Sequence, residues 1–277
     1  MYAGIPWLRQ INIATAVLFA CFFVVSCDSN EMEYSQGSRL ERIERVQNDE
    51  VVWQEVYRYN EENQVIEIEQ DTEDGFRYII EYEGGRVLQI LHHKKDLNFI
   101  VHKDSLVYNA SDRIKNHYYV FYSWETGERL SIGQIDYEYS SIGVLERMIH
   151  QVRDEREGEP RIEQLFWSAD GVRKVAHYRG NQLRFEFFYT YDNKVNVQRL
   201  DPRSLTNPVN SGQYNLISSS ARDYTGLLDL ACNPCEWSYT YNRQGLPVRL
   251  IGHFGSELRY WYSEVESDSK CCFNRNQ

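Results

Sequence analysis

The sequence predicts an all-β protein whose antiparallel strands follow one another in a long meander. Three observations predict it: the chain holds 21 Tyr, 12 Phe and 6 Trp among 277 residues, apolar and charged residues alternate with a period of two, and turn motifs recur. Large aromatic residues favour strands, and the alternation is typical of strands with one buried face. We expect about 14–17 strands. Because an open sheet rarely stays flat beyond about ten strands, this one should curl strongly or close into a soluble, barrel-like form.

The first element of the chain is an apolar run from Ile11 to Val25, preceded by Arg9. A basic residue before a short apolar run is typical of a secretion signal, and about fifteen residues fall short of the ~20 that a transmembrane anchor, the alternative, needs. Val24-Val25-Ser26-Cys27 resembles the lipobox of bacterial lipoprotein signal peptides, which implies acylation of Cys27, as by palmitate. Leu18-Phe19-Ala20-Cys21 also fits a lipobox, but cleavage there would expose an apolar start of the mature chain.

The sequence then divides into three parts. Residues 1–26 are the expected signal peptide, residues 27–38 a polar tether, and residues 39–277 a single meander domain. We expect the protein outside the cytoplasm, anchored to the outer membrane through the lipid on Cys27. The formal net charge of -11 repels nucleic acid and anionic lipid surfaces, so neither is an expected partner.

A turn motif recurs along the domain. An aromatic residue is followed by Asn or Ser, two variable positions, and Gly or Asn. The Asn or Ser side chain bonds the turn backbone, and Gly or Asn tolerates a positive φ. The four copies are Tyr59–Asn63, Tyr139–Gly143, Trp167–Gly171 and Tyr241–Gly245. Two shorter hairpin signals are Gly84-Gly85 and Gly180-Asn181.

Between the turns, alternation places one set of apolar side chains on a buried face. The expected buried sets are Leu183, Phe185, Phe187, Tyr189 and Tyr191; Phe76, Tyr78, Ile80 and Tyr82; and Ile66 with Ile68. A membrane-spanning barrel with the apolar face outward is the alternative. An acidic, lipidated chain on a polar tether disfavours it.

Two segments carry a family resemblance. Tyr189-Thr190-Tyr191-Asp192 and Tyr239–Gly245 resemble the YD repeats of bacterial RHS-type shell proteins. The chain is more similar to uncharacterised lipoproteins of Bacteroidetes-type bacteria, which are built from irregular YD-like hairpins. Their pattern matches here at Tyr189–Lys194, at Asn207-Pro208 and at Tyr239–Val248. The resemblance implies a porin-like β fold and a multiply acylated Cys27, and it implies no activity.

One long excursion, over about residues 200–236, interrupts the meander. It contains Asp201-Pro202, Asn207-Pro208 and a stretch, Ser220 to Leu230, that we expect to form a short helix. Long loops on a rigid sheet often bind ligands. We favour the interpretation that the excursion is a plug or lid for one end of the sheet, with Leu227, Leu228 and Leu230 buried; the two roles are compatible.

Four cysteines remain beyond the signal segment: Cys232, Cys235, Cys271 and Cys272. Disulfides are the usual state outside the cytoplasm, so we predict disulfides among these four and leave their pairing open. The Cys232–Cys235 spacing resembles a redox motif without the strand and helix that such a motif needs. Adjacent Cys271 and Cys272 make a zinc site awkward.

Histidines and carboxylates give weaker signals. His92, His93 and His102 suggest a metal site, but neighbouring residues of a strand face opposite sides, so at most one of the first two can join His102. The charged residues 154–159 precede Pro160 and are expected at a solvated hairpin tip. We predict no metal, no cofactor and no catalytic residue.

Four tryptophans are candidates for stacking on sugar rings: Trp53, Trp124, Trp237 and Trp261. The sequence as a whole predicts a lipid-anchored binding or structural module, whose partner is a glycan or an envelope protein, and not an enzyme. The alternative is a hydrolase, glycan-directed, on an unfamiliar β scaffold. It would require two carboxylates, or a His–carboxylate pair, converging in a pocket.

Overall fold

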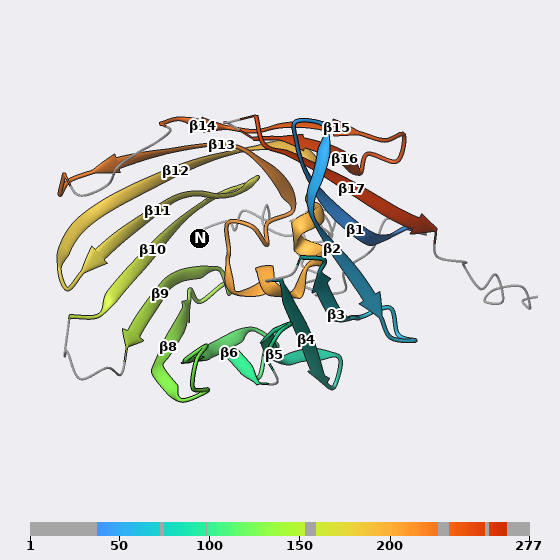
Figure 1. Ribbon diagram of the computed structural model, residues 1–277. Coiled ribbons are helices and arrows are strands. Elements are labelled where there is room, and N and C mark those ends of the chain that lie inside the picture. The colour runs from blue at the N-terminus through green and yellow to red at the C-terminus, as the bar shows by residue number, and fades with distance from the viewer. Residues whose placement is uncertain are drawn as a thin grey trace, which may run out of the picture. The chain divides into compact units, whose positions relative to one another are not determined.

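The computed structural model describes residues 38–72, 75–97, 99–152, 159–226, 233–252 and 255–264, all within one compact unit, Tyr34–Gln277. They form one antiparallel sheet of 17 strands (Figure 1), which confirms the predicted all-β meander. Cys27, the signal peptide and all of the tether except Ser38 lie outside the described residues.

Most strands follow one another through tight turns. They are β1 (Ser38–Gln47), β2 (Glu50–Tyr59), β3 (Val65–Gln70), β4 (Phe76–Glu83), β5 (Arg86–Lys94), β6 (Ile100–Tyr108), β7 (Ile114–Tyr122), β8 (Arg129–Tyr139), β9 (Leu145–Val152), β10 (Arg161–Ser168), β11 (Gly171–Arg179), β12 (Gln182–Val195), β13 (Tyr214–Asp223), β14 (Cys235–Glu236), β15 (Ser238–Tyr241), β16 (Pro247–Ile251) and β17 (Glu257–Glu264). Between β12 and β13 lie two 3-10 helices, η1 (Val197–Leu200) and η2 (Pro202–Thr206). No helix in the described ranges is long and apolar enough to cross a membrane.

The sheet closes on itself. Each strand from β1 to β13 pairs with the next, β15 and β16 lead into β17, and β17 pairs with β1, where Ile43 lies opposite Tyr260. Only Trp237 separates β14 from β15, and its backbone N–H donates to the carbonyl of Ile217 on β13. The result is a nearly closed barrel, in which the first and last described strands are neighbours.

A β-bulge lies beside the turn in most hairpins. In the β8–β9 hairpin Tyr139 lies opposite Leu145 and Glu138 opposite Arg147, so Glu146 is an extra residue on β9. The same shift occurs in the hairpins β1–β2, β2–β3, β4–β5, β6–β7, β7–β8, β10–β11, β11–β12 and β15–β16. Each bulge changes which residues of the second strand face inward.

The bulges correct one prediction about the buried face. Ile68 is fully buried at 0% exposure, but Ile66 is 37% exposed. Ile66 is the extra residue of the β2–β3 bulge, because Tyr59 lies opposite Val65 and Arg58 opposite Glu67. One inserted residue breaks the period of two. The prediction that Ile66 and Ile68 share a face is therefore wrong.

An aromatic side chain on one strand bonds a bulge on the strand directly before it. The hydroxyl of Tyr139 donates to the carbonyl of Ile114 at 2.8 Å, and the hydroxyl of Tyr108 to the carbonyl of Val87 at 3.0 Å. In each case the acceptor directly precedes the extra residue. The other pairs of this kind are Tyr59–Leu40, Tyr82–Val65, Trp167–Leu145, Tyr191–Val172 and Tyr262–Pro247. We call these contacts the aromatic ties.

The predicted turn motif forms as expected. The side-chain oxygen of Asn60 accepts from the backbone N–H groups of Glu62 and Gln64, and Asn242 does the same for its own turn. Gly143 and Gly245 adopt φ of 85° and 79°, which a glycine takes without steric cost. The motif therefore sets a tight turn. Three of its four copies, at Tyr59, Tyr139 and Trp167, also supply the aromatic residue of a tie.

The inner face carries two hydrophobic clusters, and residues 196–213 link them. We call residues 196–213 the inner segment. Val197 and Leu200 are buried in the first cluster with Ile68, and Val209 packs against the second cluster beside Ile135. The two 3-10 helices accordingly lie within the curl of strands (Figure 1). The inner segment thus fills space that the sheet alone would leave open.

Side-chain caps hold the inner segment in shape. Asn196 caps η1 and Asp201 caps η2, with Pro202 at the first helical position. The amide of Asn196 also donates to the carbonyls of Asn210 and Gly212, at 2.6 and 3.0 Å, which joins the two ends of the segment.

The expected helix within Ser220 to Leu230 is wrong in its described part. Residues 220–223 belong to β13, where Ala221 lies opposite Phe187 and Asp223 opposite Phe185. Backbone pairing with β12 overrides the local helical tendency. Leu227, Leu228 and Leu230 lie outside the described residues.

Candidate functional site

An ion pair attaches the inner segment to the wall of the sheet. Arg203 on η2 donates to both carboxylate oxygens of Glu55 on β2, at 2.8 and 2.6 Å, and its Nε donates to Asp201 at 2.9–3.0 Å. The guanidinium lies 4.5 Å from the ring centroid of Tyr78 on β4. Burial by itself lowers the pKa of Arg203, but Asp201 and Glu55 raise it above its ordinary value. One cation therefore serves two carboxylates inside the sheet.

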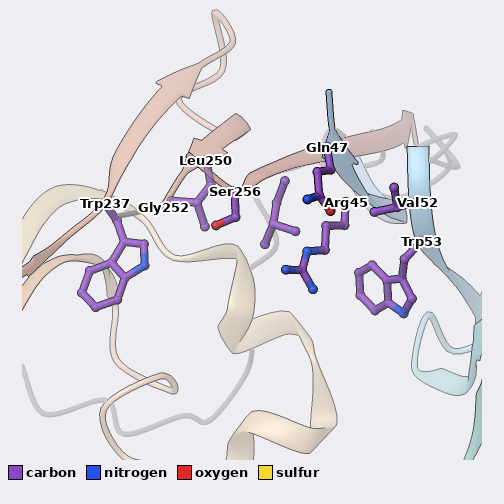
Figure 2. A pocket seen from close by; sticks show the side chains of 9 residues that line it. Arg45, Gln47, Val52, Trp53, Trp237, Leu250, Gly252 and Ser256 are labelled. Atoms are coloured by element: carbon purple, nitrogen blue, oxygen red, sulfur yellow. The ribbon is translucent and has the colours of Figure 1, made fainter. Parts of the chain in front are cut away.

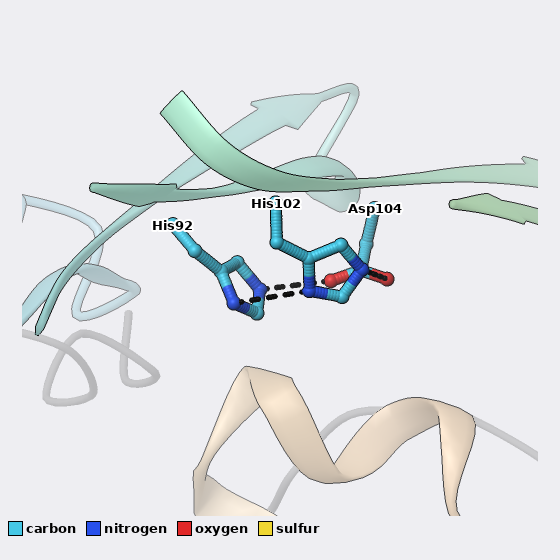
Figure 3. Close-up of side chains that lie close together, drawn as sticks. All are labelled: His92, His102 and Asp104. Carbon is cyan, nitrogen blue, oxygen red and sulfur yellow. Dashed lines mark hydrogen bonds and ion pairs between the residues drawn. The ribbon is translucent and has the colours of Figure 1, made fainter. Parts of the chain in front are cut away.

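Next to Tyr78, three histidines surround one carboxylate on β5, β6 and β7. The Nε2 atoms of His92 and His102 lie 2.8 and 3.4 Å from the oxygens of Asp104, and Nε2 of His117 lies 2.6 Å away. The Nδ1 atoms of His92 and His102 are 3.2 Å apart. Figure 3 shows His92, His102 and Asp104 extending from the strands toward the helical ribbon of the inner segment. We call His92, His102, Asp104 and His117 the histidine–aspartate cluster.

The cluster leaves three imidazole nitrogens unsatisfied. Nε2 of His92, Nε2 of His102 and Nδ1 of His117 are buried and have no hydrogen-bond partner in the described part of the chain. Although Nε2 of His92 is close to Asp104, the contact lacks hydrogen-bond geometry. A buried polar atom without a partner costs about 1–3 kcal/mol. Such atoms call for a specific explanation.

Burial and the neighbouring groups set the protonation of His102 and Asp104 at neutral pH. It lowers the pKa of His102 to about 4, because the charged imidazolium is poorly solvated there. Burial alone would raise the pKa of Asp104, but the hydrogen bond from His117 and the neighbouring histidines hold it well below its usual range. At neutral pH His102 is therefore an uncharged imidazole beside an ionised carboxylate.

Aromatic rings fix the orientation of the imidazoles. The ring of His102 stacks on Phe121 with centroids 4.2 Å apart and an angle of 10°, and Tyr78 meets His92 edge-on at 4.9 Å. Tyr119 packs against His117 at 5.7 Å. Gly133 lies on β8, and a Cβ at this position would lie 2.0 Å from the ring of Tyr119. Glycine at position 133 therefore leaves room for the Tyr119 ring.

A second carboxylate with histidines lies further along the same inner face. Nε2 of His150 is 3.0 Å from Glu163, and Nδ1 of His177 is 3.7 Å from it. Ile135, which belongs to the second hydrophobic cluster, lies opposite both His117 and His150, so the two groups share the inner face. Burial lowers the pKa of His177.

A separate pocket of about 490 Å³ lies where the sheet closes. Trp53 on β2 and Trp237 between β14 and β15 stand on opposite sides of it, with the guanidinium of Arg45 between them (Figure 2). Arg45 lies opposite both Trp53 and Leu258, so the floor runs across the junction of β2, β1 and β17. The other lining residues are Gln47, Val52, Leu250, Gly252 and Ser256.

The structure thus places two of the four candidate tryptophans together. Trp261 is 46% exposed beneath the guanidinium of Arg42, at 4.9 Å, and lines a different pocket. Trp124 is 58% exposed in the turn between β7 and β8. Cys235 is disulfide-bonded. Cys232, Cys271 and Cys272 lie outside the described residues, so the pairing stays a prediction. Of the predicted charged tip at 154–159, only Glu159 is described, and it is exposed.

Sequence reasoning found only part of the histidine–aspartate cluster. At most one of the two adjacent histidines was expected to join His102: His92 does, whereas His93 lies opposite Arg77 on the other face. Asp104 and His117 were missed. Asp104 was detectable, because His102 and Asp104 are two residues apart on one strand and so share a face. His117 depends on the pairing of β6 with β7, which has no local signature.

The described chain is thus a nearly closed antiparallel meander with polar groups inside and an aromatic pocket at its junction. No protein-family model and no curated protein matches it. Among solved structures it is similar to a porin-like protein from Bacteroides vulgatus, with 12% identity over 81% of this chain and 98% of that chain and a TM-score of 0.52.

Two further solved structures have lower TM-scores. A porin-like protein from Bacteroides uniformis is 11% identical over 81% of this chain and 98% of that chain, with a TM-score of 0.49. The Tc holotoxin pore of Photorhabdus luminescens is 10% identical over 73% of this chain and 14% of that chain, with a TM-score of 0.24. At such identities the likeness to the Bacteroides vulgatus protein establishes the fold.

Proposed function

We propose that this protein is a lipid-anchored binding module of the bacterial cell envelope and that it binds a glycan between Trp53 and Trp237. The lipobox resemblance at Cys27 and the likeness to porin-like Bacteroides proteins support this location. The YD-like turns support a relation to the lipoproteins of Bacteroidetes-type bacteria. Anchoring is through lipid on Cys27, and the protein is not an enzyme.

The observation that carries the proposal is the pair of indoles across the pocket. Sugar rings present apolar C–H faces and polar hydroxyl edges. Trp53 and Trp237 offer large flat apolar surfaces, and Arg45 supplies a cation between them. Binding sites for small ligands combine such apolar walls with a few polar groups.

Glycan binding by the full chain, solubilised in mild detergent, tests the proposal. Glycans that bind on an array are titrated by calorimetry against the wild type and the Trp53→Ala variant. We expect Trp53→Ala to weaken binding at least tenfold, or about 1.4 kcal/mol. Trp124→Ala is the matched control, because it also removes an indole but lies outside the pocket. An array without binding, or equal affinity of Trp53→Ala and wild type, would refute the glycan site.

A glycan-directed hydrolase is the second candidate function. The observation that favours it is the convergence of His92 and His102 on Asp104, since a hydrolase needs such a pair. None of these residues lines the tryptophan pocket. Release of reducing ends from any glycan that the protein binds, abolished in Asp104→Asn, would favour the hydrolase over the binding module.

A further inference from the structure

The distances within the histidine–aspartate cluster match those of metal ligands. Two ligand atoms about 2.0–2.1 Å from one ion are ~2.9–3.4 Å apart at angles of 90–109°. The Nε2 atoms of His92 and His102 lie 2.8 and 3.4 Å from Asp104 oxygens, and one ligand atom from each of the three residues lies within 4.8 Å of the others. The three side chains would close to these separations when an ion binds.

The unsatisfied nitrogens point to the same occupant. Nε2 of His92 and Nε2 of His102 both face the carboxylate without a hydrogen-bond partner among the described residues. Both lie on the side of the ring that faces Asp104. A cation bound there would accept both Nε2 lone pairs and the carboxylate charge together once each imidazole carries its proton on Nδ1, which requires the two Nδ1 atoms, now 3.2 Å apart, to move apart.

We propose that His92, His102 and Asp104 bind a divalent first-row transition metal ion, of which Zn²⁺ fits the donor set best. Two imidazole nitrogens and one carboxylate oxygen are ligands that Zn²⁺ takes in proteins, and three protein ligands leave one position open. His117 is a positioning residue: its Nε2 lies 2.6 Å from Asp104 and holds the carboxylate, as partners of metal-ligating carboxylates commonly do.

Access and rigidity suit such a site. The side chains of His92 and His102 are 19% and 20% exposed, so an ion can reach them from the interior of the sheet. All three ligands lie on two neighbouring strands, β5 and β6, where His92 is directly opposite His102. Stacking of His102 on Phe121 limits the rotation of that ring. Preorganised ligands lose less freedom when the ion binds.

Titration of the full chain in detergent tests the site. Chelator-treated protein is titrated with ZnCl₂ by calorimetry and with Co²⁺ by visible absorption. We expect one ion per chain in the wild type and at least tenfold weaker binding in His102→Ala and in Asp104→Asn. The matched control is His93→Ala, the adjacent histidine on the opposite face, which should bind as the wild type does. His177→Ala tests the group around Glu163 and should also bind normally.

Three outcomes would overturn the proposal. They are no uptake of either ion by the wild type, equal affinity of His102→Ala and wild type, or a loss of binding in His177→Ala instead. Circular dichroism of each variant shows whether it is folded. Because the Co²⁺ absorption of the wild type reports nitrogen and oxygen ligands directly, absence of its d–d bands refutes the site even if every variant unfolds. Glycan binding is measured separately, so either proposal can fail alone.

Discussion

The hydroxyl of Tyr139 on β8 donates a 2.8 Å hydrogen bond to the carbonyl of Ile114 on β7, the strand directly before it in the meander. Ile114 directly precedes the extra residue of its own hairpin's bulge, so its carbonyl lies where the strand pairing is irregular. The aromatic ties repeat this relationship around the sheet. They give Tyr59 and Tyr139 of the turn motif a role beyond filling the core.

Tyr139→Phe should therefore lower the free energy of unfolding by about 1 kcal/mol, the usual net value of one hydrogen bond. The ring and its packing stay, and only the hydroxyl is lost. Urea denaturation followed by fluorescence measures the change. Tyr118→Phe, on the neighbouring strand and 37% exposed, is the control and should have little effect. Equal stability of Tyr139→Phe and wild type would show that the tie contributes nothing.

The bulge beside Ile66 predicts unequal effects for two isoleucines two residues apart. Ile68→Ala should destabilise the protein by about 2–5 kcal/mol, because it opens a cavity in the first hydrophobic cluster. Ile66→Ala should change stability by less than about 1 kcal/mol, because its side chain faces outward. Urea denaturation of both variants checks this. Similar losses in the two would contradict the bulge.

The ion pair of Arg203 with Glu55 predicts how firmly the inner segment is held. Arg203→Ala leaves Glu55, whose side chain is 5% exposed, without its buried cation. Removing one partner of a buried pair costs about 3–5 kcal/mol. Arg243→Ala, in the exposed turn between β15 and β16, should be nearly neutral. Thermal unfolding of both variants measures the difference; a stable Arg203→Ala would mean that the other contacts of the segment hold it without this ion pair.

His102 predicts a loss of stability in mild acid. Its pKa is about 4 in the folded protein and 6.5 in the unfolded chain. As the pH falls below 6.5, His102 is protonated in the unfolded chain, but in the folded protein it is protonated only near pH 4. The contribution of neutral His102 to the free energy of unfolding is therefore complete above pH 6.5 and is lost as the pH falls toward 4.

Urea denaturation at about pH 7 and about pH 5, in the presence of a chelator, measures this effect. The wild type should lose about 1–2 kcal/mol through His102, and His102→Gln should lose correspondingly less. His177 acts in the same direction, since its pKa is also lowered, so part of the loss remains in the variant. Identical pH dependence of His102→Gln and wild type would contradict the burial of a neutral His102.

The lipobox predicts that the anchor depends on Cys27 and not on Cys21. Cys27→Ala should abolish incorporation of a labelled fatty acid, because the acylated thiol is missing. Cys21→Ala should be labelled and fractionate with membranes as the wild type does. The opposite result would move the processing site to Cys21.

The sequence by itself determined the hairpins. Turn residues act over four or five positions and strand alternation over two, so Asn60, Gly143 and the face of Phe187 follow from their neighbours in the chain. The exposure of Ile66 did not follow from its neighbours in the chain, because the bulge depends on how β3 pairs with β2.

Only the tertiary structure decided the candidate sites. Trp53 and Trp237 share a pocket because β17 closes on β1, and no local pattern encodes the pairing of strands at opposite ends of a chain. His117 reaches Asp104 through the register of β6 and β7, and Arg203 reaches Glu55 because the inner segment turns inward. The local code specifies which face each side chain takes. Closure and register, set by burial of the whole inner face, specify which distant side chains meet there.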